Sequence, residues 1–138
     1  MNQHFLRELL RAPSPTWGLM NESTGAIIAK QLIPAFDRQS RNQGLLRRTG
    51  LRTGEALILA PCSSVHTWFM RFAIDIVFVS RAGEVLKVKA GVGPWRLAAR
   101  LGSFAVIEMA AGGATGVQTG HRIGLVRLGS TSDVANAS

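Results

Sequence analysis

The chain has 138 residues, of which 46% are hydrophobic and 17% are charged, and its formal net charge at pH 7 is +8. This composition is too apolar and too weakly charged for an intrinsically disordered protein, and the length predicts one globular domain with its own core. The single cysteine, Cys62, cannot form an intrachain disulfide, so nothing in the sequence requires an oxidising compartment.

The N-terminal segment carries charges where an export signal would be apolar. Arg7, Glu8 and Arg11 interrupt the region that would form the core of a secretory signal. No window approaches the ~20 apolar residues needed to cross a bilayer. We therefore expect a soluble protein that acts in the cytoplasm.

The start of the chain predicts a helix followed by irregular structure. Residues 2–11 have the apolar pattern of a short amphipathic helix, and two prolines then end it. Residues 12–25 are rich in Pro, Ser, Asn, Thr and Gly, which is typical of a linker. We expect residues 1–24 to form an N-terminal arm, 25–128 a single globular domain, and 129–138 a frayed tail.

Short apolar and β-branched runs predict the strands of this domain. The expected strands are 26–30, 56–60, 65–72, 74–79, 84–90, 104–109 and 123–128. Pro34 should end any regular element near it, a helix should run from an N-cap at Asp37 toward Leu46, and a short helical turn should reach about Gln118. Five to seven strands with one or two short helices make a mostly β, α+β fold.

The net charge favours contact with phosphates or anionic surfaces. Only one group of arginines is clustered in the sequence: Arg38, Arg41, Arg47, Arg48 and Arg52. A solvated face of the expected helix explains this cluster as well as a phosphate-binding patch does, and no aromatic residues interleave with it to stack on bases. A basic nucleic-acid or anionic-surface binder stays an alternative.

Two isolated charges, Arg71 and Asp75, lie in the apolar middle of the chain. On a straight strand, residues four apart stand about 13 Å from each other, so these two can pair only if the chain bends at Ala73. A buried charge without a partner is strongly unfavourable, and Arg96 and Glu108 are candidate partners. The pair indicates either a structural polar network or a ligand site.

Cys62 and His66 suggest a nucleophile. An activated thiolate, an imidazole base and Asp75 as the orienting group would be the pieces of a small hydrolase or acyl-transfer enzyme. The spacing does not supply the geometry, and cysteine is often an inert buried residue. One cysteine and one nearby histidine fall short of a zinc site, so we expect no metal and no cofactor.

Trp95 stands between Pro94 and Arg96 in a loop, where it either plugs an open end of the β-structure or forms the rim of a binding surface. We expect a small non-catalytic binding or accessory module for a small molecule or a protein partner. Its polar pocket would be lined by His66, Arg71, Asp75, Trp95 and Arg96, with Glu108 as a further candidate.

Separated blocks of residues occur in the order found in one known family. They are Gly44-Leu45-Leu46 with Arg41 and Arg48, Gly54-Glu55, Pro61-Cys62, the run from His66 to Phe72 with Ile74-Asp75 and Phe78, Gly83, Pro94-Trp95-Arg96, and Glu108 with Ala111-Gly112. Over residues 25–128 the chain resembles the domain-of-unknown-function family 192. The resemblance implies a compact β-rich half-barrel and supplies no activity.

Three positions depart from the pattern of that family. Ala73 stands where members usually have proline, His121 where they commonly have aspartate, and Arg47 where they often have glycine. The first departure weakens the expectation of a tight bend between the two central strands. The second means that a carboxylate role at position 121 is not carried over.

Overall fold

A computed structural model of the chain describes residues 4–11, 17–37, 51–67 and 70–129. Its elements are α1 (Arg7–Arg11), β1 (Trp17–Asn21), β2 (Ala26–Ala29), β3 (Gln31–Ala35), β4 (Glu55–Leu59), β5 (Ser64–His66), β6 (Ile74–Val79), β7 (Val85–Val92), β8 (Leu97–Ala99), β9 (Ala105–Ala110) and β10 (Ile123–Arg127). The predicted mostly β fold is confirmed, although the described strands form three sheets and no closed barrel.

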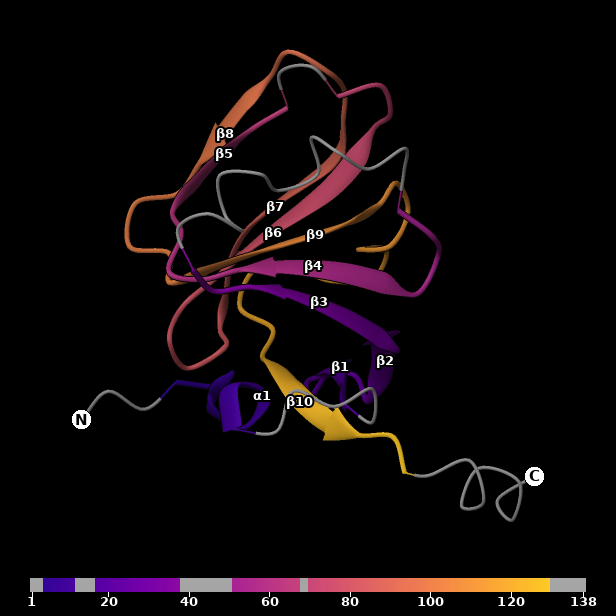
Figure 1. Ribbon diagram of the computed structural model, residues 1–138, viewed down its shortest axis with the longest axis vertical. Helices are drawn as coiled ribbons and strands as arrows, with labels where there is room; N and C mark the ends of the chain where they lie inside the picture. Colours follow the sequence, from indigo (N-terminus) through magenta and orange to yellow (C-terminus); the bar gives the residue numbers. More distant parts are fainter. Residues whose placement is uncertain (1–3, 12–16, 38–50, 68–69, 130–138) are drawn as a thin grey trace.

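The central sheet has the strand order β3-β4-β9-β6-β7 (Figure 1). β3 and β4 are parallel, and every other neighbouring pair is antiparallel. All six residues of β6 are buried, which is possible only because other elements cover both faces of the sheet. The sheet therefore separates two apolar clusters.

The helix-side cluster lies between the central sheet and the layer that contains α1 and the sheet β10-β1-β2 (Figure 1). It includes Leu6, Leu9, Leu19, Val77, Met109 and Ile123. On the opposite face of the sheet, β5 and β8 pair as a two-stranded ribbon above the ribbon-side cluster. That cluster includes Val65, Met70, Ile76, Phe78, Ala98 and Val106.

Six of the seven predicted strands are confirmed, and they correspond to β2, β4, β6, β7, β9 and β10. The strand predicted over 65–72 is wrong beyond its start, because β5 ends at His66 and residues 70–73 are irregular. Thr67 leaves the ladder because its backbone and hydroxyl groups bond to the loop 93–96. The sequence did not predict β1, β3 or the three-residue β8.

Two predictions about chain breaks are corrected. Pro34 lies inside β3, where it is tolerated because β3 is an edge strand of the central sheet. The described part of the linker predicted over 12–25 contains β1, and the expected arm supplies Leu6, Leu9 and Leu19 to the core.

The helical turn predicted up to Gln118 is also wrong. Residues 110–117 form successive tight turns and no helix. Gly112 and Gly116 interrupt any helical path, because their φ values are +93° and +85°.

Some predictions fall outside the described residues. They are the body of the helix expected from Asp37 to Leu46, the arginines at 38, 41, 47 and 48, and residues 130–138 of the tail. Within the described ranges, no helix is long and apolar enough to span a bilayer.

Candidate functional site

Asp75 is a buried carboxylate that binds three backbone N–H groups. Its side chain is 2% exposed. Oδ1 accepts a hydrogen bond from the Gly91 amide at 2.9 Å, and Oδ2 accepts from the amides of Gly112 and Ala114, each at 3.0 Å. Asp75 therefore ties β6 to β7 and to the turns of residues 110–117, and its charge is balanced by backbone dipoles.

A bulge in β7 brings the Gly91 amide to this carboxylate. Ile74 pairs with Val92 and Ile76 with Lys89, so two residues of β7 stand opposite Asp75. Gly91 has φ +61°, a value that glycine adopts without steric cost. The bulge turns its N–H out of the ladder and toward the Asp75 side chain.

Glu108 is buried on the opposite face of the same sheet. Ile76 and Leu57 are its register partners, whereas Asp75 is opposite Met109, and alternate residues of a strand point to opposite faces. The Glu108 side chain is 5% exposed, and no hydrogen bond or ion pair reaches it within the described ranges. Burial raises the pKa of Glu108 to about 7.

The expected pairing of charges is not found among the described residues. Arg71 and Arg96 are exposed, and neither guanidinium makes a hydrogen bond or ion pair there. Asp75 binds backbone amides, and Glu108 faces the other cluster. Asp75 is thus part of a polar network with backbone amides, and Arg71 takes no part in that network.

The structure does not bring Cys62, His66 and Asp75 together as an acyl-transfer site. Cys62 is half-buried against the ribbon-side cluster, and its thiol donates a hydrogen bond to the Ser64 carbonyl at 3.2 Å. His66 is exposed at the end of β5. Asp75 faces the helix-side cluster across the sheet, so it cannot orient this imidazole. No group of three or more His, Cys, Asp or Glu side chains that could hold a metal ion occurs in the described residues.

Thr67, which the sequence analysis missed, holds the loop that presents Trp95. Its hydroxyl donates to the Gly93 carbonyl at 2.6 Å and accepts from the Arg96 amide at 2.8 Å. Its N–H donates to the Arg96 carbonyl at 2.8 Å, and its carbonyl accepts from the Trp95 amide at 3.0 Å. Trp95 is 61% exposed and has φ +63°, the only positive φ outside glycine in the described chain.

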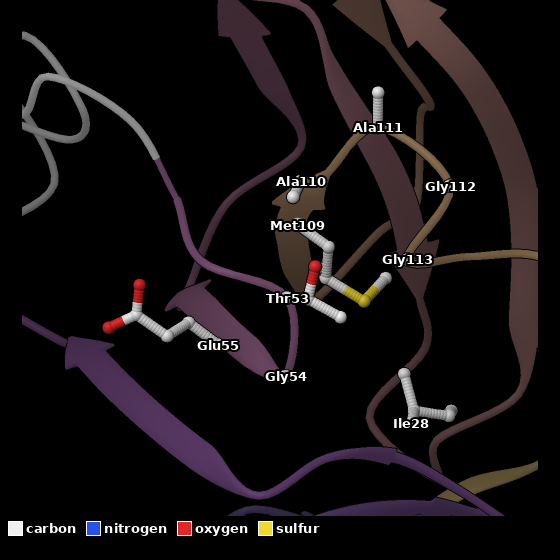
Figure 2. A pocket seen from close by; sticks show the side chains of 9 residues that line it. All are labelled: Ile28, Thr53, Gly54, Glu55, Met109, Ala110, Ala111, Gly112 and Gly113. Atoms are coloured by element: carbon white, nitrogen blue, oxygen red, sulfur yellow. The ribbon is translucent and has the colours of Figure 1, made fainter.

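A small hollow lies where β4 begins and β9 ends (Figure 2). It is lined by Ile28, residues 53–55 and residues 109–113, and its volume is about 70 Å³. A Cβ added at Gly113 would stand 2.8 Å from the Met109 Cβ. None of the predicted site residues lines this hollow, and its volume is below the range of ligand pockets, about 300–1,000 Å³.

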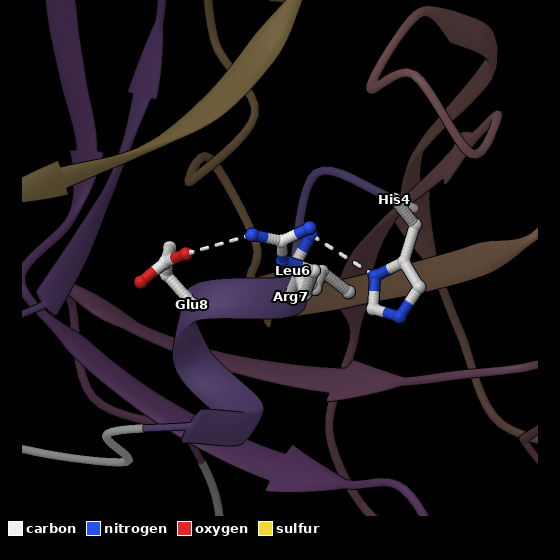
Figure 3. Close-up of polar contacts among 4 residues, drawn as sticks. All are labelled: His4, Leu6, Arg7 and Glu8. Carbon is white, nitrogen blue, oxygen red and sulfur yellow. Dashed lines mark hydrogen bonds and ion pairs between the residues drawn. The ribbon is translucent and has the colours of Figure 1, made fainter. Parts of the chain in front are cut away.

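His4 packs the N-terminal segment against Phe104, the residue that directly precedes β9. Its Nδ1 accepts a hydrogen bond from the Leu6 amide at 3.2 Å (Figure 3), and the centroids of the His4 and Phe104 rings are 4.7 Å apart. The Arg81 guanidinium lies 4.6 Å from the Phe104 centroid. Burial lowers the pKa of His4, and the nearby charges of Arg81 and Arg7 lower it further.

Comparison with known proteins identifies the family. The model of the family DUF192, described as an uncharacterized ACR, matches residues 20–125. The chain belongs to the DUF192 family. This confirms the resemblance seen in the sequence. No curated protein matches the chain.

Two solved structures share the DUF192 fold of this chain. One is a protein of unknown function from Novosphingobium aromaticivorans, with a TM-score of 0.66 and 22% identity over 78% of this chain and 81% of the other. The second is a candidate transcription regulator from Sinorhizobium meliloti, with a TM-score of 0.65 and 18% identity over 78% of this chain and 89% of the other. At these identities the likeness shows the fold alone.

His121 has a structural role. Its Nδ1 accepts a hydrogen bond from the Gln118 amide at 3.1 Å and lies 3.0 Å from the Asn21 side-chain nitrogen. A backbone amide can only donate, so Nδ1 is an acceptor and the ring proton of the neutral imidazole is on Nε2. The ring thus joins β1 to the segment that precedes β10.

Proposed function

We propose that this DUF192 domain is a non-catalytic binding module that uses one exposed surface. The surface consists of the outward face of the β5–β8 ribbon and the adjoining loops, and we call it the ribbon surface: His66, Arg71, Trp95, Arg96, Leu97, Arg100 and Leu101. The observation that supports the proposal best is the conformation of Trp95, which is held at a positive φ with 61% of the residue exposed.

A positive φ at a non-glycine residue costs about 1–3 kcal/mol and persists only where neighbouring structure enforces it. Here the enforcing contacts are the hydrogen bonds between Thr67 and residues 93–96. This strained conformation does not bury the tryptophan side chain, because Trp95 stays largely exposed. A rigid, strained loop that presents a tryptophan to solvent is typical of a recognition site.

The proposal excludes Asp75 and Glu108 from direct contact with a partner. Both side chains are at least nine-tenths buried, so they support the sheet beneath the surface. Among the charged residues predicted for the site, Arg71 and Arg96 are accessible, which favours an anionic partner. We place the site of action in the cytoplasm, where the single cysteine would stay reduced.

The test is a thermal-shift panel on the parent protein with inorganic phosphate, nucleotides, single-stranded DNA, an acidic peptide and anionic vesicles. A ligand at 100 times its Kd adds about 2.7 kcal/mol of stability, which shifts Tm by several degrees in a domain of this size. We expect at least one hit that Trp95→Ala and Arg71→Ala abolish while each variant keeps the parent Tm without ligand.

The matched control is Ile27→Ala, which removes an exposed apolar side chain from β2. This variant should keep every hit. Hits that survive both Trp95→Ala and Arg71→Ala, or that Ile27→Ala removes equally, would contradict the proposed surface. Unfolding of the Arg71→Ala variant would give Arg71 a structural role instead.

A further inference from the structure

The ribbon surface has an unbalanced charge. Residues 56–74 and 85–107 contain no Asp or Glu. The same segments supply five cations: Arg71, Lys87, Lys89, Arg96 and Arg100. These segments contain β5, β7 and β8 together with most of β4 and part of β9, and the β5–β8 ribbon lies at one end of the molecule (Figure 1). The charged side chains of these two segments are therefore all positive, and they attract anions.

Exposed apolar side chains are concentrated in the same part of the chain. Four large hydrophobic residues are exposed in the described chain, and three of them are Trp95 at 61%, Leu97 at 70% and Leu101 at 90%. These three lie within seven consecutive residues, which span at most about 20 Å in extended chain. The fourth, Ile27, is on β2 in another sheet. Such a concentration beside cations marks an interaction surface.

The alternation of β8 explains why Leu97 is exposed. Ala98 is buried against the ribbon-side cluster, so Leu97 and Ala99 face away from the core. On β5, the partners of these two residues, His66 and Ser64, are also exposed. The outward face of the ribbon thus presents an exposed leucine among small and weakly polar side chains.

We propose that the ribbon surface docks on an anionic lipid surface. Trp95, Leu97 and Leu101 enter the headgroup region, where tryptophan is favoured and leucine gains from the acyl chains. Arg71, Arg96 and Arg100 contact the lipid phosphates. This inference rests on the proposed function and names the chemical class of its partner.

The side chains favour lipid over the other anionic partners. Binding of single-stranded nucleic acid depends on several aromatic faces for base stacking, whereas the two most exposed apolar residues in the described ranges are leucines. A protein partner needs complementary shape over about 800 Å² on each side, and a ribbon of two three-residue strands is small for that. A lipid surface adapts to the protein and needs no preformed cavity.

The experiment is co-sedimentation of the full chain with vesicles of phosphatidylcholine, with and without phosphatidylglycerol. We expect binding only to the vesicles that contain phosphatidylglycerol, and a partition coefficient that falls as salt rises. Arg96→Gln and Arg100→Gln should each lower that coefficient about fivefold, and Leu101→Ser should lower it at least as much. Lys30→Gln and Ile27→Ser are the matched controls, because both residues are exposed on another part of the molecule.

The outcomes separate this inference from the proposed function. Docking through this surface would be overturned if Lys30→Gln and Arg96→Gln lowered the partition coefficient equally. It would also be overturned if Leu101→Ser left vesicle binding unchanged. The protein could instead fail to bind vesicles while single-stranded DNA or an acidic peptide raises its Tm in a Trp95-dependent way. That result would overturn the lipid partner and leave the proposed binding module intact. Absence of any Trp95-dependent binding would overturn both. Circular dichroism and Tm verify that each variant is folded.

Discussion

Glu108→Gln should change how the stability of this domain depends on pH. Burial raises the pKa of Glu108 to about 7 from its usual value of 4.5. In the unfolded chain the carboxyl loses its proton near 4.5, while in the folded protein it keeps the proton up to about 7. The folded state therefore binds more protons between these values, and the free energy of unfolding falls as pH rises.

The size of this loss follows from the shift. Each pKa unit corresponds to 1.36 kcal/mol, so Glu108 removes about 3 kcal/mol of stability between pH 4.5 and pH 7, and this penalty stays at higher pH. Glutamine keeps the shape and polarity of the protonated acid and does not titrate. We expect the variant to match the parent near pH 4 and to be more stable above pH 7 by about 3 kcal/mol.

Urea unfolding at intervals from pH 4 to pH 8 measures this difference directly. Subtracting the two stability curves cancels the titration of groups that the substitution leaves unperturbed. The control is Glu84→Gln, at an exposed position, which should leave the curve close to that of the parent. Parallel curves for parent and Glu108→Gln across the whole range would refute the argument that burial perturbs this carboxyl.

Four further predictions follow from contacts of the core and loops. Asp75→Asn should cost roughly 3 kcal/mol in urea unfolding, because the amide oxygen can accept from at most two of the three N–H groups and its NH2 group then faces the third; a loss below about 1 kcal/mol would contradict this. Gly91→Ala should cost about 1 kcal/mol from its positive φ alone, since a Cβ there meets nothing within 4 Å. Thr67→Val should lower the hydrogen-exchange protection of the Trp95 amide and leave protection in β6 unchanged. The difference in urea-unfolding free energy between the parent and His4→Gln should shift in favour of the variant as pH falls below 6.5, because the lowered pKa of His4 makes the parent lose stability there.

The sequence predicted those strands that consist of a continuous run of apolar residues. β4, β6 and β9 are runs of buried apolar residues bounded by breaks, and they were found almost to the residue. β1 was missed because its neighbours in sequence are typical of linkers. Its place is decided by pairing with β10, about a hundred residues away, and a single sequence carries no signal for such distant pairing. β8 has only three residues, which is too short for any periodicity.

The sequence supplied candidate residues for a site, which stay predictions, and it could not show how they are arranged. The sequence correctly indicated that a buried Asp75 needs partners, yet those partners are backbone amides, which every residue except proline carries and no pattern reveals. Trp95 was identified from its Gly-Pro loop. Its positive φ depends on Thr67, which the predicted strand over 65–72 had placed in regular structure.

The separation of Arg71 from Asp75 is what makes the surface charge available. Had the two paired, the guanidinium would have neutralised the carboxylate and lost part of its capacity to bind an external anion. Instead, three amides from β7 and from the turns after β9 stabilise the Asp75 charge inside the sheet. Arg71 is exposed near the ribbon, and the segment that contains it, residues 56–74, has no Asp or Glu. The backbone of this domain thus balances the buried charge of Asp75, and Arg71 stays available for the anionic partner proposed above.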